Sequence, residues 1–263
     1  LRFNPFQHFN NAIEPFCTGL DRNRSIQRIT FCTMDLMGGE IFRSLRPFLK
    51  NNQTISEIEV EQCQFGDGSA HQVSLALRGC SKSLKLFRVV DNQLGGEQSS
   101  EIIEALKVHS QLKTLDLDGM NIRRRERTAL ATLLQSSTEL CELCLIDNSI
   151  DDEGVDILVA GGTLTNLSLL DLSDNSSISA GGYQTLASLL EYPNCNLGRL
   201  DLRHNNMGDE GALIFANALA NNRSLKRLDL ESNDITRVGC RSLAVLLGNI
   251  NSDLEQIDLR KNI

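Results

Sequence analysis

Residues 197–205 read LGRLDLRHN, and residues 225–233 read LKRLDLESN. This nine-residue phrase, apolar at positions 1, 4 and 6 and ending on Asn at position 9, decides the fold. The phrase recurs along the chain, beginning at Ile26, Ile55, Leu84, Leu112, Leu140, Leu167, Leu197, Leu225 and Leu254. These starts number repeats 1 to 9. They lie 27 to 30 residues apart, a period that indicates stacked repeats rather than one closed core.

Each repeat is expected to contain one strand and one helix. Positions 4 and 6 point to the same side of a strand, because side chains alternate along it. Behind the strand an apolar stretch with helical spacing follows, as in Leu130/Leu133/Leu134 and Leu243/Leu246/Leu247. Parallel strands stack about 4.8 Å apart, whereas helices need about 8–10 Å. The mismatch predicts an α/β solenoid bent like a horseshoe, with a parallel β-sheet on the concave face and helices on the convex face.

Position 9 is expected to hold the turns together. Its amide can bond neighbouring backbone groups that would otherwise be buried without partners. The residues concerned are Asn92, Asn148, Asn175, Asn205, Asn233 and Asn262, with Cys63 in repeat 2.

The phrase L-x-x-L-x-L-x-x-N/C over residues 26–263 resembles the leucine-rich repeat family, and the 28–29-residue length resembles its ribonuclease-inhibitor subclass. The resemblance implies a non-catalytic scaffold that binds a partner protein on the concave face and adjacent loops. Because the subclass includes the Ran GTPase-activating protein, a GTPase-activating regulator is an alternative. A structural subunit of a larger assembly is another.

The ends of the chain depart from the repeat. Residues 1–25 lack the phrase and place aromatic residues with near-helical spacing, which predicts an N-terminal helical cap or half repeat; a partner-binding amphipathic segment is the alternative. Residues 26–263 form nine repeats, the last truncated, since Ile263 directly follows the ninth position 9. We expect the chain to be part of a longer chain or complex.

Composition excludes several functions. The 263 residues carry a net charge of −8, which argues against nucleic-acid binding. The sequence contains no apolar run of about 20 residues and no secretory signal, so we expect no membrane partner. Scattered cysteines favour a reducing, cytoplasmic compartment. HExxH, GxSxG, GxGxxG and GxxxxGK[ST] are absent. The sequence therefore predicts no enzyme, no cofactor and no metal.

Three local motifs have ordinary explanations. Cys141-x-x-Cys144 places its sulfurs on opposite faces of one strand, which disfavours zinc. The basic run 123–127 (RRRER) is interpreted as a solvated loop, with an acidic-partner contact or a localisation signal as alternatives. Five N-x-[ST] sequons begin at Asn23, Asn52, Asn166, Asn175 and Asn222. They are weak evidence for secretion, because the segment that leads into a repeat often has this sequence for reasons of the repeat itself.

The candidate partner-binding residues occupy positions 3, 5, 7 and 8, which should face outward on the concave surface. They are Glu57, Glu59, Glu61, Arg88, Asp116, Asp118, Glu142, Ile146, Asp171, Arg199, Asp201, Arg203, Arg227, Asp229 and Glu231. Stacked carboxylates repel one another unless a counterion offsets them, so a basic partner is one interpretation. The other is that Asp at position 5 is the family's usual filler. The absence of Trp weighs against a tight aromatic-anchored interface.

Overall fold

The computed structural model describes residues 1–3, 18–20, 23–36, 39–66, 68–80, 82–92, 94–160, 163–248 and 252–263. Most of the predicted N-terminal cap therefore lies outside the described residues. The chain divides into two compact units, one of residues 1–121 and 128–140 and the other of residues 122–127 and 141–263. Each unit is described by itself.

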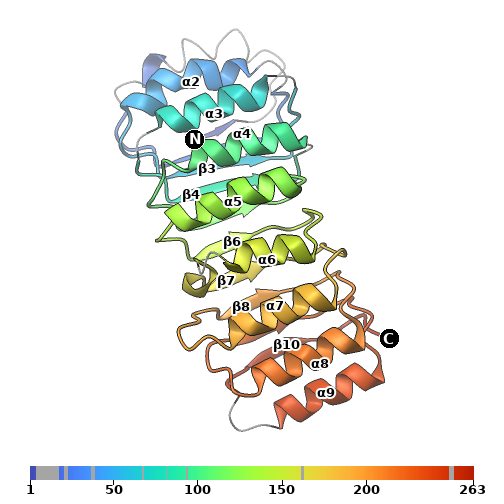
Figure 1. The fold of residues 1–263 in the computed structure, drawn as a ribbon. Helices are drawn as coiled ribbons and strands as arrows, with labels where there is room; N and C mark the ends of the chain where they lie inside the picture. Colours follow the sequence, from blue (N-terminus) through green and yellow to red (C-terminus); the bar gives the residue numbers. More distant parts are fainter. Residues whose placement is uncertain are drawn as a thin grey trace. The chain divides into compact units, whose positions relative to one another are not determined.

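The first unit alternates parallel strands with helices (Figure 1). Its elements are β1 (Arg2–Phe3), β2 (Arg28–Cys32), α2 (Glu40–Asn51), β3 (Glu57–Glu61), α3 (Ser69–Gly79), β4 (Leu86–Val90), α4 (Gly96–Leu106), β5 (Thr114–Leu117) and most of α5 (Arg124–Ser136). Each strand pairs with the strand of the next repeat at the same phrase position, as Glu57 does with Leu86 and Leu86 with Thr114.

The second unit repeats the arrangement. Its elements are the start of α5, β6 (Glu142–Cys144), α6 (Asp152–Ala160), the 3-10 helix η2 (Thr163–Asn166), β7 (Leu169–Asp171), α7 (Ala180–Leu190), β8 (Arg199–Asp201), α8 (Gly208–Leu219), β9 (Arg227–Asp229), α9 (Arg237–Leu247) and β10 (Gln256–Asp258). The predicted α/β solenoid of strand-plus-helix repeats is confirmed, with parallel strands in chain order.

One strand was not predicted. Arg2 and Phe3 pair in parallel with Thr30 and Phe31, so the sheet begins before the first phrase. Phe3 is buried, and its ring stacks on Phe31 with centroids 5.1 Å apart. The aromatic spacing in residues 1–25 therefore includes a residue that covers the first repeat from a strand rather than from a helix.

The core lies between strands and helices and follows the phrase. In repeat 4, Leu112, Leu115 and Leu117 at positions 1, 4 and 6 have no exposed surface, and neither do Leu130 and Leu133 on the apolar stripe of α5. Burying a Leu side chain stabilises a fold by about 1.5–3 kcal/mol. Repetition of this contact set lets short strands and helices form a stable stack.

Asparagine at position 9 joins consecutive turns as predicted. Asn175 is fully buried. Its Oδ1 accepts from the backbone N–H groups of Asn148 (3.0 Å) and Ile150 (2.9 Å). Its Nδ2 donates to the carbonyls of Leu145, Leu172 and Ser173. Asn92 makes the equivalent bonds in the first unit.

A second link between repeats joins helix starts in the second unit. The Asp209 carboxylate, near the start of α8, accepts from the backbone N–H of Thr236 (2.8 Å), the Thr236 hydroxyl (2.7 Å) and the backbone N–H of Gly239 (2.8 Å). These groups begin α9, so Asp209 supplies acceptors to orphan N–H groups of the next helix. Asp152 accepts in the same way from Ser179 at the start of α7.

Candidate protein-interaction surface

The strand face is defined as positions 3, 5, 7 and 8 of the strands within each unit, the side opposite the helices. In β4 the alternation is regular: Phe87 and Val89 are buried, whereas Leu86, Arg88 and Val90 are half-buried. This face holds every candidate residue listed above. The two units supply separate parts of it.

In the first unit, the acidic residues already have partners within the protein. The Arg28 guanidinium pairs with Glu57 on the adjacent strand, and this hydrogen bond raises the pKa of Arg28. The Thr30 hydroxyl donates to the Glu59 carboxylate at 2.9 Å. Arg88 Nε lies 3.0 Å from Asp116 Oδ2, and Arg88 Nη1 lies 3.9 Å from Glu59. Glu59 and Asp116 are buried beneath these contacts.

In the second unit, Asp at position 5 bonds its own turn. The Oδ1 atoms of Asp171, Asp201, Asp229 and Asp258 each accept from the backbone N–H two residues ahead, at 3.0, 3.2, 3.2 and 3.0 Å. Such bonds compete with strand pairing. The strands β7 to β10 all end on this Asp, after three residues. By contrast β2, β3 and β4, with Thr, Glu and Arg at position 5, run for five residues.

Basic side chains lie between the carboxylates of the second unit. Arg203 Nε is 2.8 Å from Asp201 and 3.6 Å from Asp229, and the hydrogen bond to Asp201 raises the Arg203 pKa. Burial raises the pKa of Asp171 and of Asp229. The position-5 column is thus a hydrogen-bonded and partly neutralised layer, which gives the filler interpretation a structural basis.

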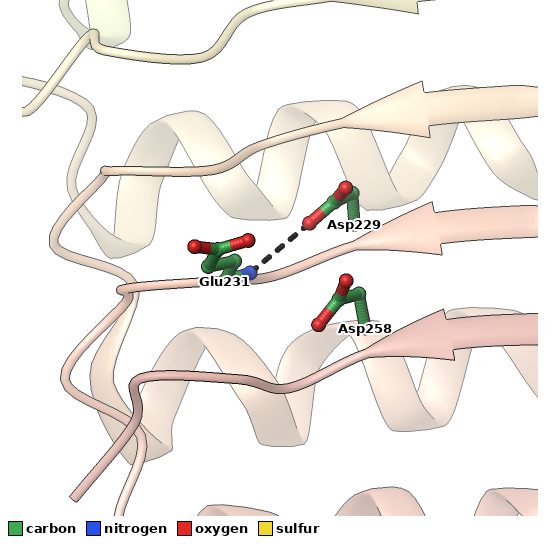
Figure 2. A group of neighbouring side chains, drawn as sticks. All are labelled: Asp229, Glu231 and Asp258. Atoms are coloured by element: carbon green, nitrogen blue, oxygen red, sulfur yellow. Dashed lines mark hydrogen bonds between the residues drawn. The ribbon is translucent and has the colours of Figure 1, made fainter.

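Three carboxylates converge near the end of the chain. Asp229, Glu231 and Asp258 have oxygens within 4.8 Å of one another, close enough to bind a metal ion. Figure 2 shows Asp229 at the end of β9, Glu231 on the segment that follows β9 and Asp258 at the end of β10, with the Glu231 N–H donating to Asp229. Arg260 lies 2.7 Å from Asp258 and 2.9 Å from Glu231, and Lys261 lies 2.8 Å from Glu231. The hydrogen bond from Lys261 lowers the pKa of Glu231, and that from Arg260 lowers the pKa of Asp258. These cations act as the cluster's internal counterions.

Exposure divides the candidate residues into three groups. Glu59, Asp116, Asp171, Asp201 and Glu231 are buried. Glu142, Arg199 and Arg227 are exposed, and Glu57, Glu61, Arg88, Asp118, Ile146, Arg203 and Asp229 are half-buried. The exposed group lies at position 3, where Glu142, Leu169, Arg199 and Arg227 follow one another across β6 to β9.

The interpretation of residues 123–127 as a solvated loop is wrong in two respects: residues 124–127 lie in α5, and Glu126 and Arg127 are buried. Arg123, Arg124 and Arg125 are exposed, but Arg127 lies in the first turns of α5 and is 5% exposed. Arg127 Nη1 is 2.7 Å from Asp151, and Arg127 Nη2 donates to the Ser149 carbonyl at 3.1 Å. The side chain belongs to the packing of the second unit, which letter composition alone does not reveal.

Other sequence features also find structural roles. Asn52 and Asn222 are buried, and each Oδ1 accepts from backbone N–H groups two and three residues ahead. Glycan attachment to these two amides is incompatible with the fold.

His109 is fully buried, and burial lowers its pKa. Cys141 is exposed and Cys144 is half-buried. Within the described helices, none combines the length and apolar character that crossing a bilayer requires.

Comparison with known proteins agrees with this geometry. The family model described as "Leucine Rich repeat" matches residues 194–216 and 221–244. This match and the relatives named ribonuclease inhibitor support the leucine-rich repeat family and, within it, the ribonuclease-inhibitor-like type.

The relatives are longer than the chain. It is 28% identical to ribonuclease inhibitor of Sus scrofa over 95% of this chain and 55% of that protein. It is 25% identical to NACHT, LRR and PYD domains-containing protein 14 of Mus musculus over 89% of this chain and 23% of that protein. The solved structure of the Q64V53_BACFR protein from Bacteroides fragilis matches with a TM-score of 0.59 at 12% identity, covering all of this chain and 74% of that one. That structure supports the fold.

Proposed function

We propose that this chain is a non-catalytic scaffold that binds a protein partner through the strand face and adjacent loops. The proposal is supported by a difference in exposure between two kinds of position on that face. Buried position-5 Asp residues are fixed by their own turns, and exposed position-3 side chains stand beside them in register. A pre-ordered row of this kind binds with little loss of conformational freedom.

Partner charge follows from the groups left exposed. Because Arg28, Arg88, Arg203 and Arg260 pair with strand-face carboxylates, the face attracts a basic partner less than its composition suggests. The second unit presents both signs, with Glu142 on β6 and Arg199 and Arg227 on β8 and β9. The partner proposed for it therefore carries paired acidic and basic groups at its contact surface, which favours specificity over raw affinity.

Site-specific photo-crosslinking tests the proposal. A photoreactive amino acid replaces Arg227 on the strand face or, as the matched control, Val245 on the exposed side of α9, which is 78% exposed. Both variants are illuminated in cell extract, with and without prior nuclease treatment. We expect a discrete protein adduct from position 227, absent from position 245 and reduced when Arg199→Glu is added.

Adducts of equal yield from both positions, or adducts only from position 245, would contradict the strand-face proposal. An adduct lost on nuclease treatment would indicate a nucleic-acid partner instead. GTPase activation and a structural-subunit role stay predictions; stimulation of GTP hydrolysis by a crosslinked GTPase would favour the former.

A further inference from the structure

The first unit contains a groove on its helical side, lined by residues of α2 and α3. Figure 1 shows these two helices as neighbours. The groove has a volume of about 470 Å³. Arg43, Arg46, Pro47 and Lys50 line it from α2, and Leu75 lines it from α3. It lies on different elements from the strand face, so it is independent of the function proposed above.

The three cations of the groove lie along one side of α2. Spacings of three and four residues place Arg43, Arg46 and Lys50 next to one another on the helix surface, and all three are exposed. Among the residues that the structure describes, none forms an ion pair or side-chain hydrogen bond with them. The strand-face arginines of the same unit, Arg28 and Arg88, are paired with carboxylates.

Helix stability does not account for this cluster. Neighbouring like charges at these spacings repel and destabilise a helix. Lys50 in the last turn complements the helix dipole. However, Arg43 lies near the N-terminal end of α2, where the dipole disfavours a cation. Glu40, three residues before Arg43 in the first turn of α2, is an acidic neighbour but forms no ion pair with it, so within the described residues no paired anion offsets the repulsion among the three cations.

The groove also offers apolar surface between the charges. Pro47 is exposed and Leu75 is half-buried. We propose that the α2–α3 groove binds an acidic polypeptide segment, whose carboxylates contact Arg43, Arg46 and Lys50 while an aliphatic side chain packs on Leu75 and Pro47. A peptide is favoured over an extended polyanion because the chain's net charge of −8 repels long anions beyond the groove.

Fluorescence anisotropy tests the proposal with the full chain. The probe is a fluorescein-labelled peptide of alternating Glu and Leu, and its Gln/Leu counterpart is the charge control. The variant Arg43→Glu/Arg46→Glu/Lys50→Glu is compared with Arg123→Glu/Arg124→Glu/Arg125→Glu, which makes the same charge change at the exposed start of α5. We expect the α2 variant to weaken binding of the Glu peptide by about tenfold or more, and the α5 variant by less than about twofold.

Equal weakening by both variants would overturn the proposal, because it would indicate net charge alone. So would equal binding of the Gln and Glu peptides. Tighter binding of single-stranded DNA or of phosphatidylserine vesicles at the same groove would assign it to another class of anion. Circular dichroism of each variant confirms folding, and Leu75→Ala gives a second, charge-neutral variant that we expect to weaken the Glu peptide as well.

Discussion

At the scale of single residues, Asp at position 5 has a role that its charge does not suggest. Asp171 is buried, and its Oδ1 accepts from both the backbone N–H (3.0 Å) and the hydroxyl (2.6 Å) of Ser173. Burial raises its pKa above the usual value for Asp, so the ionised form is disfavoured in the folded state. The side chain contributes an oxygen acceptor to the turn, and its negative charge lowers the stability of the folded state.

Asp171→Asn tests this role, because Asn keeps the acceptor and removes the charge. We expect the free energy of unfolding at pH 7 to rise. The sign follows from linkage: the folded protein holds this proton to a higher pH than the unfolded chain, so the wild type is penalised above the folded pKa and the difference shrinks as the pH falls through it. Urea unfolding across pH 4–7 provides the measurement.

Asp171→Ala removes the acceptor too and should lower the free energy of unfolding by about 1 kcal/mol. Asp174→Asn, at an exposed position with φ 57°, is the control and should change stability by less than about 0.5 kcal/mol. A lower stability for Asp171→Asn than for the wild type at pH 7 would show that the carboxylate charge is favourable.

At the scale of elements, the helices of the second unit are joined at their starts. Gly239, in the first turn of α9, lies against Asp209 of the preceding repeat. A Cβ there would come within 2.6 Å of Asp209 Oδ1, 2.7 Å of Ile235 Cγ2 and 3.1 Å of Ala212 Cβ. The glycine permits the close approach through which Asp209 reaches the N–H groups of the next helix.

Gly239→Ala should therefore destabilise the protein by about 1–3 kcal/mol through overpacking, although Ala is the better helix former. Gly79→Ala is the matched control: Gly79 ends α3, and a Cβ there meets nothing within 4 Å. We expect that change to be neutral or stabilising in thermal unfolding. Stabilisation by both substitutions would mean that the contact with Asp209 is loose.

The sequence predicted the elements well and their contacts less well. The repeat period and the pattern of apolar residues predicted each described strand of repeats 1–9 and the Asn hydrogen bonds at position 9, because both follow from the spacing of residues within one repeat. Strand length depends on whether the residue at position 5 bonds its own turn. The burial of Arg127 and the Asp209 link depend on which side chain a neighbouring repeat supplies. A run of adjacent basic residues does not reveal the α2 cations, because they are separated in sequence; the helical spacing of Arg43, Arg46 and Lys50 is the signal that identifies them.

At the scale of the whole molecule, the repeat architecture makes stability a sum of neighbouring terms. Asn175 and Asn205 interact directly, from neighbouring repeats. The Asn175 N–H donates to Asn205 Oδ1 at 2.9 Å, and both side chains donate to the Leu172 carbonyl. Asn92 and Asn233 lie in different units and share no hydrogen-bond partner.

Double-mutant cycles with Asn→Ala should therefore separate the two pairs. Each single change should cost about 2–4 kcal/mol, because buried backbone groups lose partners. The Asn175/Asn205 cycle should show a coupling free energy above about 0.5 kcal/mol, and the Asn92/Asn233 cycle should be additive within about 0.5 kcal/mol. Exposed Asn196→Ala is the control. Equal coupling in both cycles would indicate long-range cooperativity.

The hydrogen bond between each position-5 Asp and its turn also distinguishes positions that folding constrains from positions that can vary. Replacing a position-5 Asp by a residue without an oxygen acceptor disturbs the turn on which the next residues depend. Replacing the exposed Arg227 alters what the surface presents, whereas Arg199 also lies 3.4 Å from the buried Asp201. New binding specificity can therefore arise at position 3 where the side chain has no partner in the turn. A combinatorial library built on this chain should vary Glu142, Leu169 and Arg227 and keep an oxygen acceptor at positions 171, 201 and 229.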